Sequence, residues 1–375
     1  MFEPFDKKIH VTRPLLPPLS AFNVKLREIW SSQWLSNNGR QHRALEEKIK
    51  ERLKVPNACL FNNGTTALIA AVQSLRLTGE VITTPFTFPA TPHVLMWNNI
   101  RPVFCDINPQ TLNIDAKNIE RLITPATTGI LGVHVFGMPC EVSAIRKLAE
   151  RHGLKVIYDA AHAFDLEIDG DGIGNYGDIS MFSFHPTKLF HTAEGGCLTF
   201  REKGLKQHMD LLKNFGIKDE ETVLIPGING KMNELQAALG LLVLDMLDAE
   251  REKRQKLLEV YSRELKGIEG VTFYEKPANV KDSCQYFAIR INKDMFGKSR
   301  DFVYDEFKKY NVFSRKYFYP LCSEYACYKH LPSSNKENLP VAHQVASEVL
   351  CLPFYGGLNV LDVKKICAIL RSFKR

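Results

Sequence analysis

Residues 155–164 read KVIYDAAHAF, a short apolar run that is rich in β-formers and ends at Asp159. The stretch before it, EVSAIRKLAERHG from Glu141, has helical spacing, and Gly153 supplies a C-terminal stop. The stretch after it, ISMFSFHPTK at 179–188, is again an apolar run followed by polar residues. Strands that alternate with helices indicate a mostly parallel sheet covered on both faces. Such sheets bind ligands outside the carboxyl ends of their strands.

The same alternation extends over the first two thirds of the chain. Helical patterns begin near Ala67 and Asp115 as well as near Glu141. Seven short runs are strand candidates: 58–63, 80–85, 101–107, 129–136, 155–161, 179–185 and 196–200. The pattern therefore predicts an α/β domain with a seven-stranded, mostly parallel sheet.

The pattern changes after Gly227. A long helical stretch, as one helix or two, is first apolar and then charged, and short strand and helix patterns follow it. We expect a large α/β domain at 1–240, with an N-terminal arm that packs across one of the domains. A smaller α+β domain is expected at 241–375.

Composition excludes several classes of protein. With 375 residues, 45% hydrophobic and 24% charged, the chain is neither disordered nor a coiled coil as a whole. No apolar run approaches the ~18 residues of a membrane span, and we expect no signal peptide and no membrane association. Lys and Arg exceed Asp and Glu by 49 to 42, which favours anionic partners, but the charges are interspersed and nucleic acid is not expected. Nine cysteines without a CxxC favour free thiols over a metal site, and a cytoplasmic location.

One motif is rejected as a nucleotide site. GIGNYG at 172–177 is a literal GxGxxG. A dinucleotide-binding loop must follow a strand and open a helix, whose N-terminus holds the pyrophosphate. Here the next run, ISMFSFH, is a strand candidate, so we predict a loop between two strands.

A more informative pair is Asp159, at the end of one strand, and Lys188, just after the next. Ser183, His185 and Glu194 belong to the same loop region. Taken singly, Lys188 could be a solvated surface charge and Asp159 a turn or helix cap. Together they match what a pyridoxal cofactor requires, a lysine for the Schiff base and an acid that keeps the ring nitrogen protonated.

A third segment, FNNGTTAL at 61–68, suits an anion. A strand ends in two asparagines, Gly64 permits a sharp turn, and Thr65 and Thr66 open a helix. Backbone N–H groups beside hydroxyls form a phosphate site. An ordinary helix cap by threonine is the alternative.

Together these motifs resemble those of the DegT/StrS family of sugar-nucleotide aminotransferases, from SQWLSNNG near residue 36 to VLCLPFYGG near 355. The motifs in order are NGTTAL, TTPFTFPAT, DAAHAF, SFHPTK with EGG, and GINGKMNELQAA. The resemblance implies pyridoxal 5'-phosphate as cofactor and fold type I, the aspartate aminotransferase-like fold. Within the family the motifs look most like those of members that make dTDP-4-amino-4,6-dideoxyglucose.

The resemblance also implies roles for individual residues. Lys188 matches the Schiff-base lysine and Asp159 the partner of the ring nitrogen. His162 stands where many members have Gln near the cofactor's 3-oxygen, and Phe88 where an aromatic ring stacks on the cofactor. The phosphate cradle would be formed by Gly64, Thr65 and Ser183, and by Asn229 from a neighbouring subunit. The region lining the sugar-nucleotide entrance would contain Arg315, Tyr317 and Tyr319.

The implied reaction is a transamination. L-Glutamate would give its amino group, and a keto-sugar nucleotide, dTDP-4-dehydro-6-deoxy-D-glucose for surface polysaccharide, would receive it in a homodimer with shared sites. A C3-keto isomer or a UDP sugar is the alternative substrate. Related sugar dehydratases carry His in place of Lys188, and a non-catalytic regulator would not need Lys188 and Asp159. Both residues are present, which favours the aminotransferase.

Overall fold

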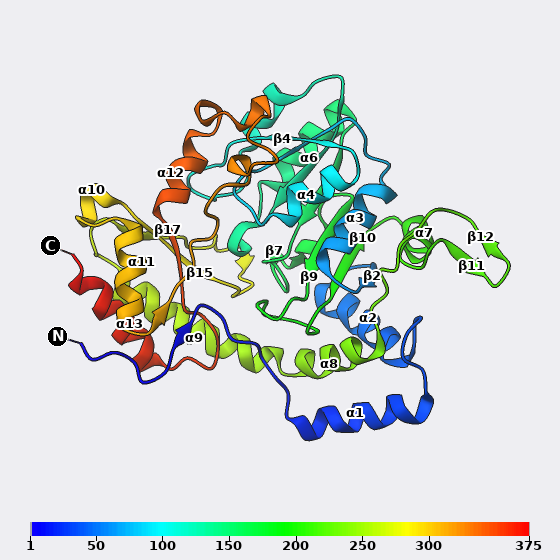
Figure 1. Cartoon of the computed structure of the whole chain (residues 1–375), viewed down its shortest axis with the longest axis horizontal. Helices are drawn as coiled ribbons and strands as arrows, with labels where there is room; N and C mark the ends of the chain where they lie inside the picture. The colour runs from blue at the N-terminus through cyan, green and yellow to red at the C-terminus, as the bar shows by residue number, and fades with distance from the viewer. Residues whose placement is uncertain (1, 375) are drawn as a thin grey trace.

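The computed structural model describes residues 2–374. Its centre is one seven-stranded sheet (Figure 1). In spatial order the strands are β2 (Asn57–Phe61), β10 (Gly196–Phe200), β9 (Ile179–Ser183), β6 (Lys155–Asp159), β5 (Thr127–Val133), β3 (Glu80–Thr83) and β4 (Arg101–Phe104). All seven predicted strands are present in this sheet, so the predicted α/β class is confirmed.

The sheet is parallel except at β10. This strand runs antiparallel to both of its neighbours, with Leu198 opposite Cys59 on β2 and Met181 on β9. Because two reversals restore the direction, β2 runs parallel to β9 and β6. The carboxyl ends of these three strands therefore lie at one edge of the sheet, where a ligand site is expected.

Helices cover both faces of the sheet. One face packs on α3 (Gly64–Ser74), α4 (Ala90–Trp97) and α7 (Gly204–Leu212). The other packs on α2 (Arg40–Leu53), α6 (Val142–His152) and α8 (Glu234–Asp245). On β6, Ile157 faces the first group and Val156 the second. Burial on both faces explains why the strand sequences are continuously apolar.

The helices and loops predicted between the strands are present with small differences. Gly153 ends α6 with a positive φ of 64°, as expected for a C-terminal stop. Asp115 caps α5 (Ala116–Ile119) by accepting from the Lys117 N–H at 3.0 Å, and a 3₁₀ turn replaces the rest of that helix. The GIGNYG segment forms a short 3₁₀ turn at Ile173–Asn175 and is followed by β9 rather than by a helix, in agreement with the predicted loop between two strands.

After Gly227 the long helical stretch forms two helices. α8 packs in the core beside α2, and α9 (Leu247–Leu265) leads to the C-terminal core (Figure 1). The predicted domain boundary between 240 and 241 falls within α8 and stays a prediction.

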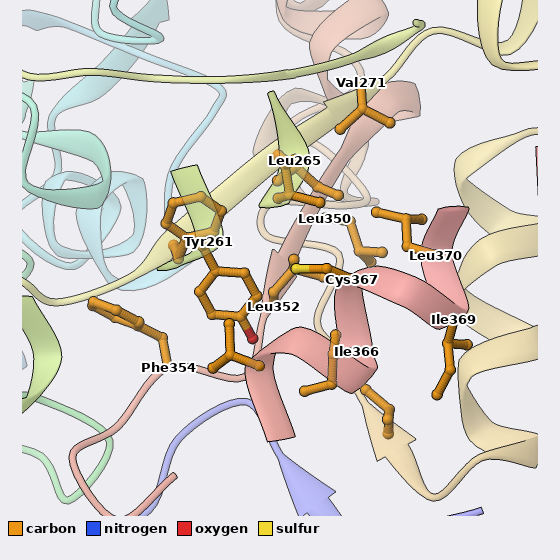
Figure 2. Packing of buried hydrophobic residues seen from close by; sticks show 14 of the residues in the cluster. Tyr261, Leu265, Val271, Leu350, Leu352, Phe354, Ile366, Cys367, Ile369 and Leu370 are labelled. Carbon is orange, nitrogen blue, oxygen red and sulfur yellow. The ribbon is translucent and has the colours of Figure 1, made fainter. Parts of the chain in front are cut away.

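The C-terminal core surrounds a three-stranded antiparallel sheet. Its strands are β13 (Val271–Phe273), β15 (Phe287–Ile291) and β17 (Val349–Leu352), and α9 and α13 (Val360–Ser372) pack beside them. Figure 2 shows Tyr261 of α9 and Ile366 of α13 in this cluster. Further helices of this region are α10 (Lys293–Phe296), α11 (Arg300–Lys309) and α12 (Pro340–Glu348). A smaller α+β unit was predicted here.

The N-terminal arm contacts both parts of the chain, whereas the sequence suggested only one. β1 (Ile9–His10) pairs with β16 (Val312–Phe313), and α1 (Leu19–Ser32) lies along α8 (Figure 1). A small sheet of β7 (Glu167–Ile168), β8 (Asp171–Gly172) and β14 (Val280–Lys281) joins the two cores. The hairpin of β11 (Ile217–Asp219) and β12 (Thr222–Val223) projects at the right of Figure 1. Within residues 2–374, no helix combines the length and apolar character that crossing a membrane requires.

Candidate active site

A cavity of about 550 Å³ opens at the edge where β2, β6 and β9 end. It collects most of the site residues that the sequence predicts, although they are spread over more than 250 positions of the chain. The predicted residues that line it are Gly64, Thr65, Phe88, Asp159, His162, Ser183, Lys188 and Tyr317.

Three predicted residues lie outside this lining. Asn229 is exposed, and its backbone oxygen accepts from the side chain of Asn62 at 3.2 Å. Arg315 is exposed and pairs through its backbone with Cys351 of β17. Tyr319 is 55% exposed. Within one chain these residues do not contribute to the cavity, and their roles stay predictions.

Asp159 is the last residue of β6 and is 5% exposed. One carboxylate oxygen accepts from the Ala161 N–H at 3.0 Å, so the turn-capping role weighed for this residue is also present. The other oxygen accepts from the Thr91 hydroxyl at 2.8 Å, which leaves Thr87 to donate to Thr91. Burial raises the pKa of Asp159, and the two hydrogen bonds and the charge of Lys188 oppose that rise.

Lys188 lies on the loop between β9 and β10, with its backbone N–H bonded to the His185 carbonyl at 2.9 Å. Its side chain lines the cavity, and its amine lies 5.8 Å from the ring centre of Tyr286. Burial lowers the pKa of this amine from the usual 10.5 to about 8, and attraction to Asp159 opposes the shift. A lysine with such a pKa is a usable base or nucleophile near neutral pH.

His162 is a neutral histidine with one defined tautomer. Its Nδ1 accepts from the Phe136 N–H at 3.2 Å, so the ring proton resides on Nε2. Burial, together with the charges of Lys188 and Lys276, holds the pKa of His162 well below its ordinary value. The ring is packed edge-on to Tyr286, with centres 4.9 Å apart. His162 can therefore donate one hydrogen bond without carrying charge.

The N-terminus of α3 forms the other end of the cavity. Asn63 caps this helix by accepting from the Thr66 N–H at 2.9 Å, so the capping alternative is realised by Asn63. The next residues, Gly64 and Thr65, line the cavity beside Ser183. A Cβ on Gly64 would lie 3.1 Å from that of Ser183, so glycine allows the start of α3 to approach β9 closely. A helix N-terminus beside two hydroxyls is a suitable site for an anion.

The cavity mouth carries a polar pair already noted in the sequence. His185 and Glu194 both line the cavity, with Nε2 and Oε1 3.9 Å apart. Both are exposed. They can offer hydrogen bonds to a polar ligand that enters.

Sequence analysis missed several residues of the cavity or its surroundings. They are Thr91, Gln285, Tyr286 and Phe318. Gln285 and Tyr286 lie outside every motif, and Phe318 stands between the predicted residues Tyr317 and Tyr319 without being singled out. Thr91 is the last residue of the TTPFTFPAT motif, a stretch dense in hydroxyls at the end of β3, but the motif gave no role to this threonine. Nothing comparable marks Gln285 or Tyr286.

The site combines three chemical features in one enclosed space. A buried carboxylate, an amine with a lowered pKa and a helix N-terminus suited to a phosphate all line it. Among residues 2–374, no group of three or more His, Cys, Asp and Glu side chains is arranged to hold a metal ion. The arrangement suits a ligand that carries a phosphate for the helix N-terminus and a positive charge for Asp159. Lys188 could transfer protons to and from such a ligand.

Comparison with known proteins agrees with this chemistry. A dTDP-4-amino-4,6-dideoxy-D-glucose transaminase of Escherichia coli is 47% identical over 368 residues, covering 97% of this chain and 98% of that protein. The Shigella dysenteriae protein of the same name is 43% identical, covering 98% and 100%. DesI, solved in the presence of its TDP-sugar product, has a TM-score of 0.94 at 34% identity, covering 99% of this chain and 94% of DesI.

The match to a family is equally extensive. Residues 20–371 match the DegT/DnrJ/EryC1/StrS aminotransferase family, a span that contains every residue lining the cavity. The chain is therefore an aminotransferase and belongs to the DegT/DnrJ/EryC1/StrS family.

Proposed function

We propose that this aminotransferase uses pyridoxal 5'-phosphate to move the amino group of L-glutamate to C4 of dTDP-4-dehydro-6-deoxy-D-glucose. The observation that carries the proposal is the meeting of Asp159, Lys188 and the α3 N-terminus in one cavity. The product would be dTDP-4-amino-4,6-dideoxy-D-glucose, a precursor for surface polysaccharide. The two bacterial relatives with 47% and 43% identity carry the name of this activity.

The residues present fit the cofactor. Gly64, Thr65 and Ser183 would hold the phosphate, because they line the cavity together at the N-terminus of α3. Asp159 would hold the ring nitrogen, whose positive charge adds an attraction that favours the ionised carboxylate. The Nε2–H of His162 would donate to the 3-oxygen, and Phe88, at the rim, would cover the ring. When bound, the cofactor supplies an electron sink for charge that develops on the substrate carbon.

Lys188 would perform the proton transfers. Its amine, with a pKa of about 8, accepts the α-proton of the amino acid and later delivers a proton to the sugar carbon. Asp159 would keep the ring nitrogen protonated, and its bonds to Thr91 and Ala161 hold the carboxylate in place. The enclosed walls, including Tyr286 and Phe318, exclude water from Lys188.

The second substrate enters at the mouth of the same cavity. His185, Glu194 and Tyr317 are the polar groups there, and Arg315 lies outside it, exposed. A C3-keto isomer and a UDP sugar are the competing substrates. A non-catalytic role would leave Lys188 and Asp159 without a purpose.

We further propose a homodimer whose active sites are shared. Large apolar side chains are exposed on and just after α1 and on the hairpin, among them Trp30, Leu35 and Val223 at 65%, 55% and 67%. Exposed apolar groups of this kind mark protein interfaces. Asn229, exposed and outside the cavity of its own chain, would reach the cofactor phosphate of the partner. Nine free thiols suit a reducing compartment, and we place the enzyme in the cytoplasm.

A substrate panel tests the proposed function. The purified enzyme with pyridoxal 5'-phosphate is incubated with L-glutamate and, separately, 4-keto and 3-keto dTDP sugars and a UDP-4-keto sugar. We expect 2-oxoglutarate to form fastest with dTDP-4-dehydro-6-deoxy-D-glucose. Faster turnover of another sugar would reassign the substrate, and absence of turnover with all of them would refute the proposal. The Lys188→Ala variant is the matched blank.

A further inference from the structure

Gln285 bonds to the backbone on both sides of Lys188. Its Oε1 accepts from the Leu189 N–H at 2.6 Å, and its Nε2 donates to the Thr187 carbonyl at 3.0 Å. The side chain is 2% exposed. The backbone groups determine how the amide is oriented, since an N–H requires an acceptor and a carbonyl a donor.

These two bonds act on the two peptide planes that meet at the Cα of Lys188. The Thr187 carbonyl belongs to the plane before Lys188 and the Leu189 N–H to the plane after it. A peptide unit is rigid, so the only soft backbone angles of Lys188 are its own φ and ψ. One side chain that holds both planes therefore restrains both angles, and with them the direction in which the Lys188 side chain leaves the backbone.

Gln285 comes from outside the loop that it holds. It lies in the segment before β15, near the C-terminal core, whereas Lys188 belongs to the large sheet. The segment is itself anchored, since Arg254 donates to the Cys284 carbonyl at 3.1 Å and Ser283 donates to the His162 carbonyl at 2.8 Å. Gln285 is thus a fixed support for the loop.

We propose that Gln285 is a positioning residue that sets the backbone of Lys188 and so the placement of its amine. The inference rests on the proposed role of Lys188 in proton transfer. Misplacement of a reacting group by about 1 Å can lower a rate on the order of 100-fold. We call the two bonds from Gln285 to Thr187 and Leu189 the clamp. Loss of the clamp would therefore lower kcat and leave substrate binding at the cavity mouth nearly unchanged.

Three substitutions test the clamp. Gln285→Met keeps an unbranched side chain of similar length and removes both bonds. Gln285→Glu keeps the acceptor for Leu189 and loses the donor to Thr187. Gln285→His can retain one donor and one acceptor. Lys281→Met is the control, because Lys281 also ties the C-terminal part to the large domain, bonding to Glu167 at 2.8 Å away from the cavity.

Two measurements are made on each variant. Steady-state kinetics give kcat and KM for the sugar nucleotide. Hydrogen exchange, resolved to single residues in the cofactor-free protein, follows the Lys188 N–H, which bonds to the His185 carbonyl and not to Gln285. Faster exchange at this N–H reports a loosened backbone rather than the bond that was removed.

We expect Gln285→Met to lower kcat by about 10- to 100-fold with KM within about twofold, and to speed exchange at Lys188. Gln285→Glu should fall between Met and the parent, and Gln285→His should recover most of the loss. If Gln285→Met does not fold, Gln285→Glu decides by the same measures. Unchanged exchange at Lys188, or a kcat loss no larger than that of Lys281→Met, would overturn the inference. Exchange needs no turnover, so it decides the clamp even if the proposed reaction proves wrong.

Discussion

Asp159 and Lys188 both lose contact with water in the cavity, and burial shifts their pKa values in opposite directions. The pKa of Asp159 rises and that of Lys188 falls to about 8. Each shift favours the neutral form of the group, and the attraction between the two charges works against both shifts. The consequences for Lys188 and for Asp159 can therefore be tested in separate experiments.

The lowered pKa of Lys188 predicts how cofactor capture depends on pH. In the proposed role of Lys188, only its neutral amine would form a covalent link to the cofactor, and the neutral fraction falls about tenfold per pH unit below the pKa. In cofactor-free protein, capture of pyridoxal 5'-phosphate should speed up about tenfold from pH 6 to 7 and level off above about pH 8. Stopped-flow absorbance measures this rate. A capture rate that still rises steeply at pH 9.5 would show that Lys188 has the usual lysine pKa. The Lys188→Ala variant should show no absorbance change from covalent capture.

Asp159→Asn separates charge from shape. The amide fits the same space but cannot hold a proton on the ring nitrogen, so we expect kcat to fall by about 1,000-fold or more with the cofactor still bound. Turnover and retained cofactor absorbance are measured together. A loss below about tenfold would mean that another residue has this function. Thr91→Val is an informative companion, since it removes one of the two bonds to the carboxylate.

Among single residues, the sequence motifs predicted the charged groups of the site but not the residues that hydrogen-bond to them or to their backbone. Asp159 ends a strand, Lys188 and Gly64 lie on the segments just after strands, and the ends of parallel strands converge, so their meeting followed from local sequence. Gln285 reaches the same place through tertiary packing, whereas Thr91 ends the TTPFTFPAT motif but was given no role. A single polar residue far along the chain has no sequence pattern that marks it.

At the scale of elements, one helix depends on a residue far away in sequence. α2 begins after Gly39, which has no side chain to cap it. Instead the Glu234 carboxylate accepts from the N–H groups of Gln41 at 2.8 Å and His42 at 2.9 Å. A Cβ on Gly39 would clash with this carboxylate. Glu234 thus caps α2 while it begins α8.

We expect Glu234→Ala to lower the free energy of unfolding by about 1–2 kcal/mol, because two buried N–H groups at a helix start lose their acceptor. Urea unfolding at fixed protein concentration measures the change. The control is Glu221→Ala, at an exposed position in the hairpin, which should alter stability by no more than about 0.5 kcal/mol. Equal effects of the two variants would contradict the capping role.

Strands and helices could be predicted from the sequence where their burial leaves a recognisable pattern of apolar residues. The seven strands are apolar on both faces and bounded by turn residues, and each was located from sequence. The hairpin of β11 and β12 is mostly exposed, so its residues carry no apolar alternation, and it was not predicted. The cap of α2 by Glu234 joins residues more than 190 positions apart and was equally invisible.

At the scale of the whole molecule, the proposed shared sites predict that two defective chains can complement each other. A mixture of Lys188→Ala and Asn229→Ala chains should contain mixed dimers in which one site carries both lesions and the other carries none. Activity should therefore appear that Lys188→Ala alone lacks and that exceeds Asn229→Ala alone. The interface should be large, on the order of 2,000 Å² or more.

The control for this experiment is proof that mixed dimers form, by differential tagging and co-purification. If they form and activity is not restored, Asn229 acts within its own subunit. The exposure of Asn229 in the single chain is consistent with either subunit as its target, so only the mixture distinguishes the two arrangements.

The antiparallel pairing of β10 with β2 has a consequence for synthesis on the ribosome. β2 has no other partner in the large sheet, and Cys59 meets Leu198 roughly 140 residues later. At ~5–20 residues per second, the β2 segment waits on the order of ten seconds before its neighbour is translated. Until then the apolar run ACLF at 58–61 is an open edge that chaperones can bind. The loop that follows it cannot meet Ser183, so a nascent chain would acquire the proposed phosphate cradle only after β10 has been made.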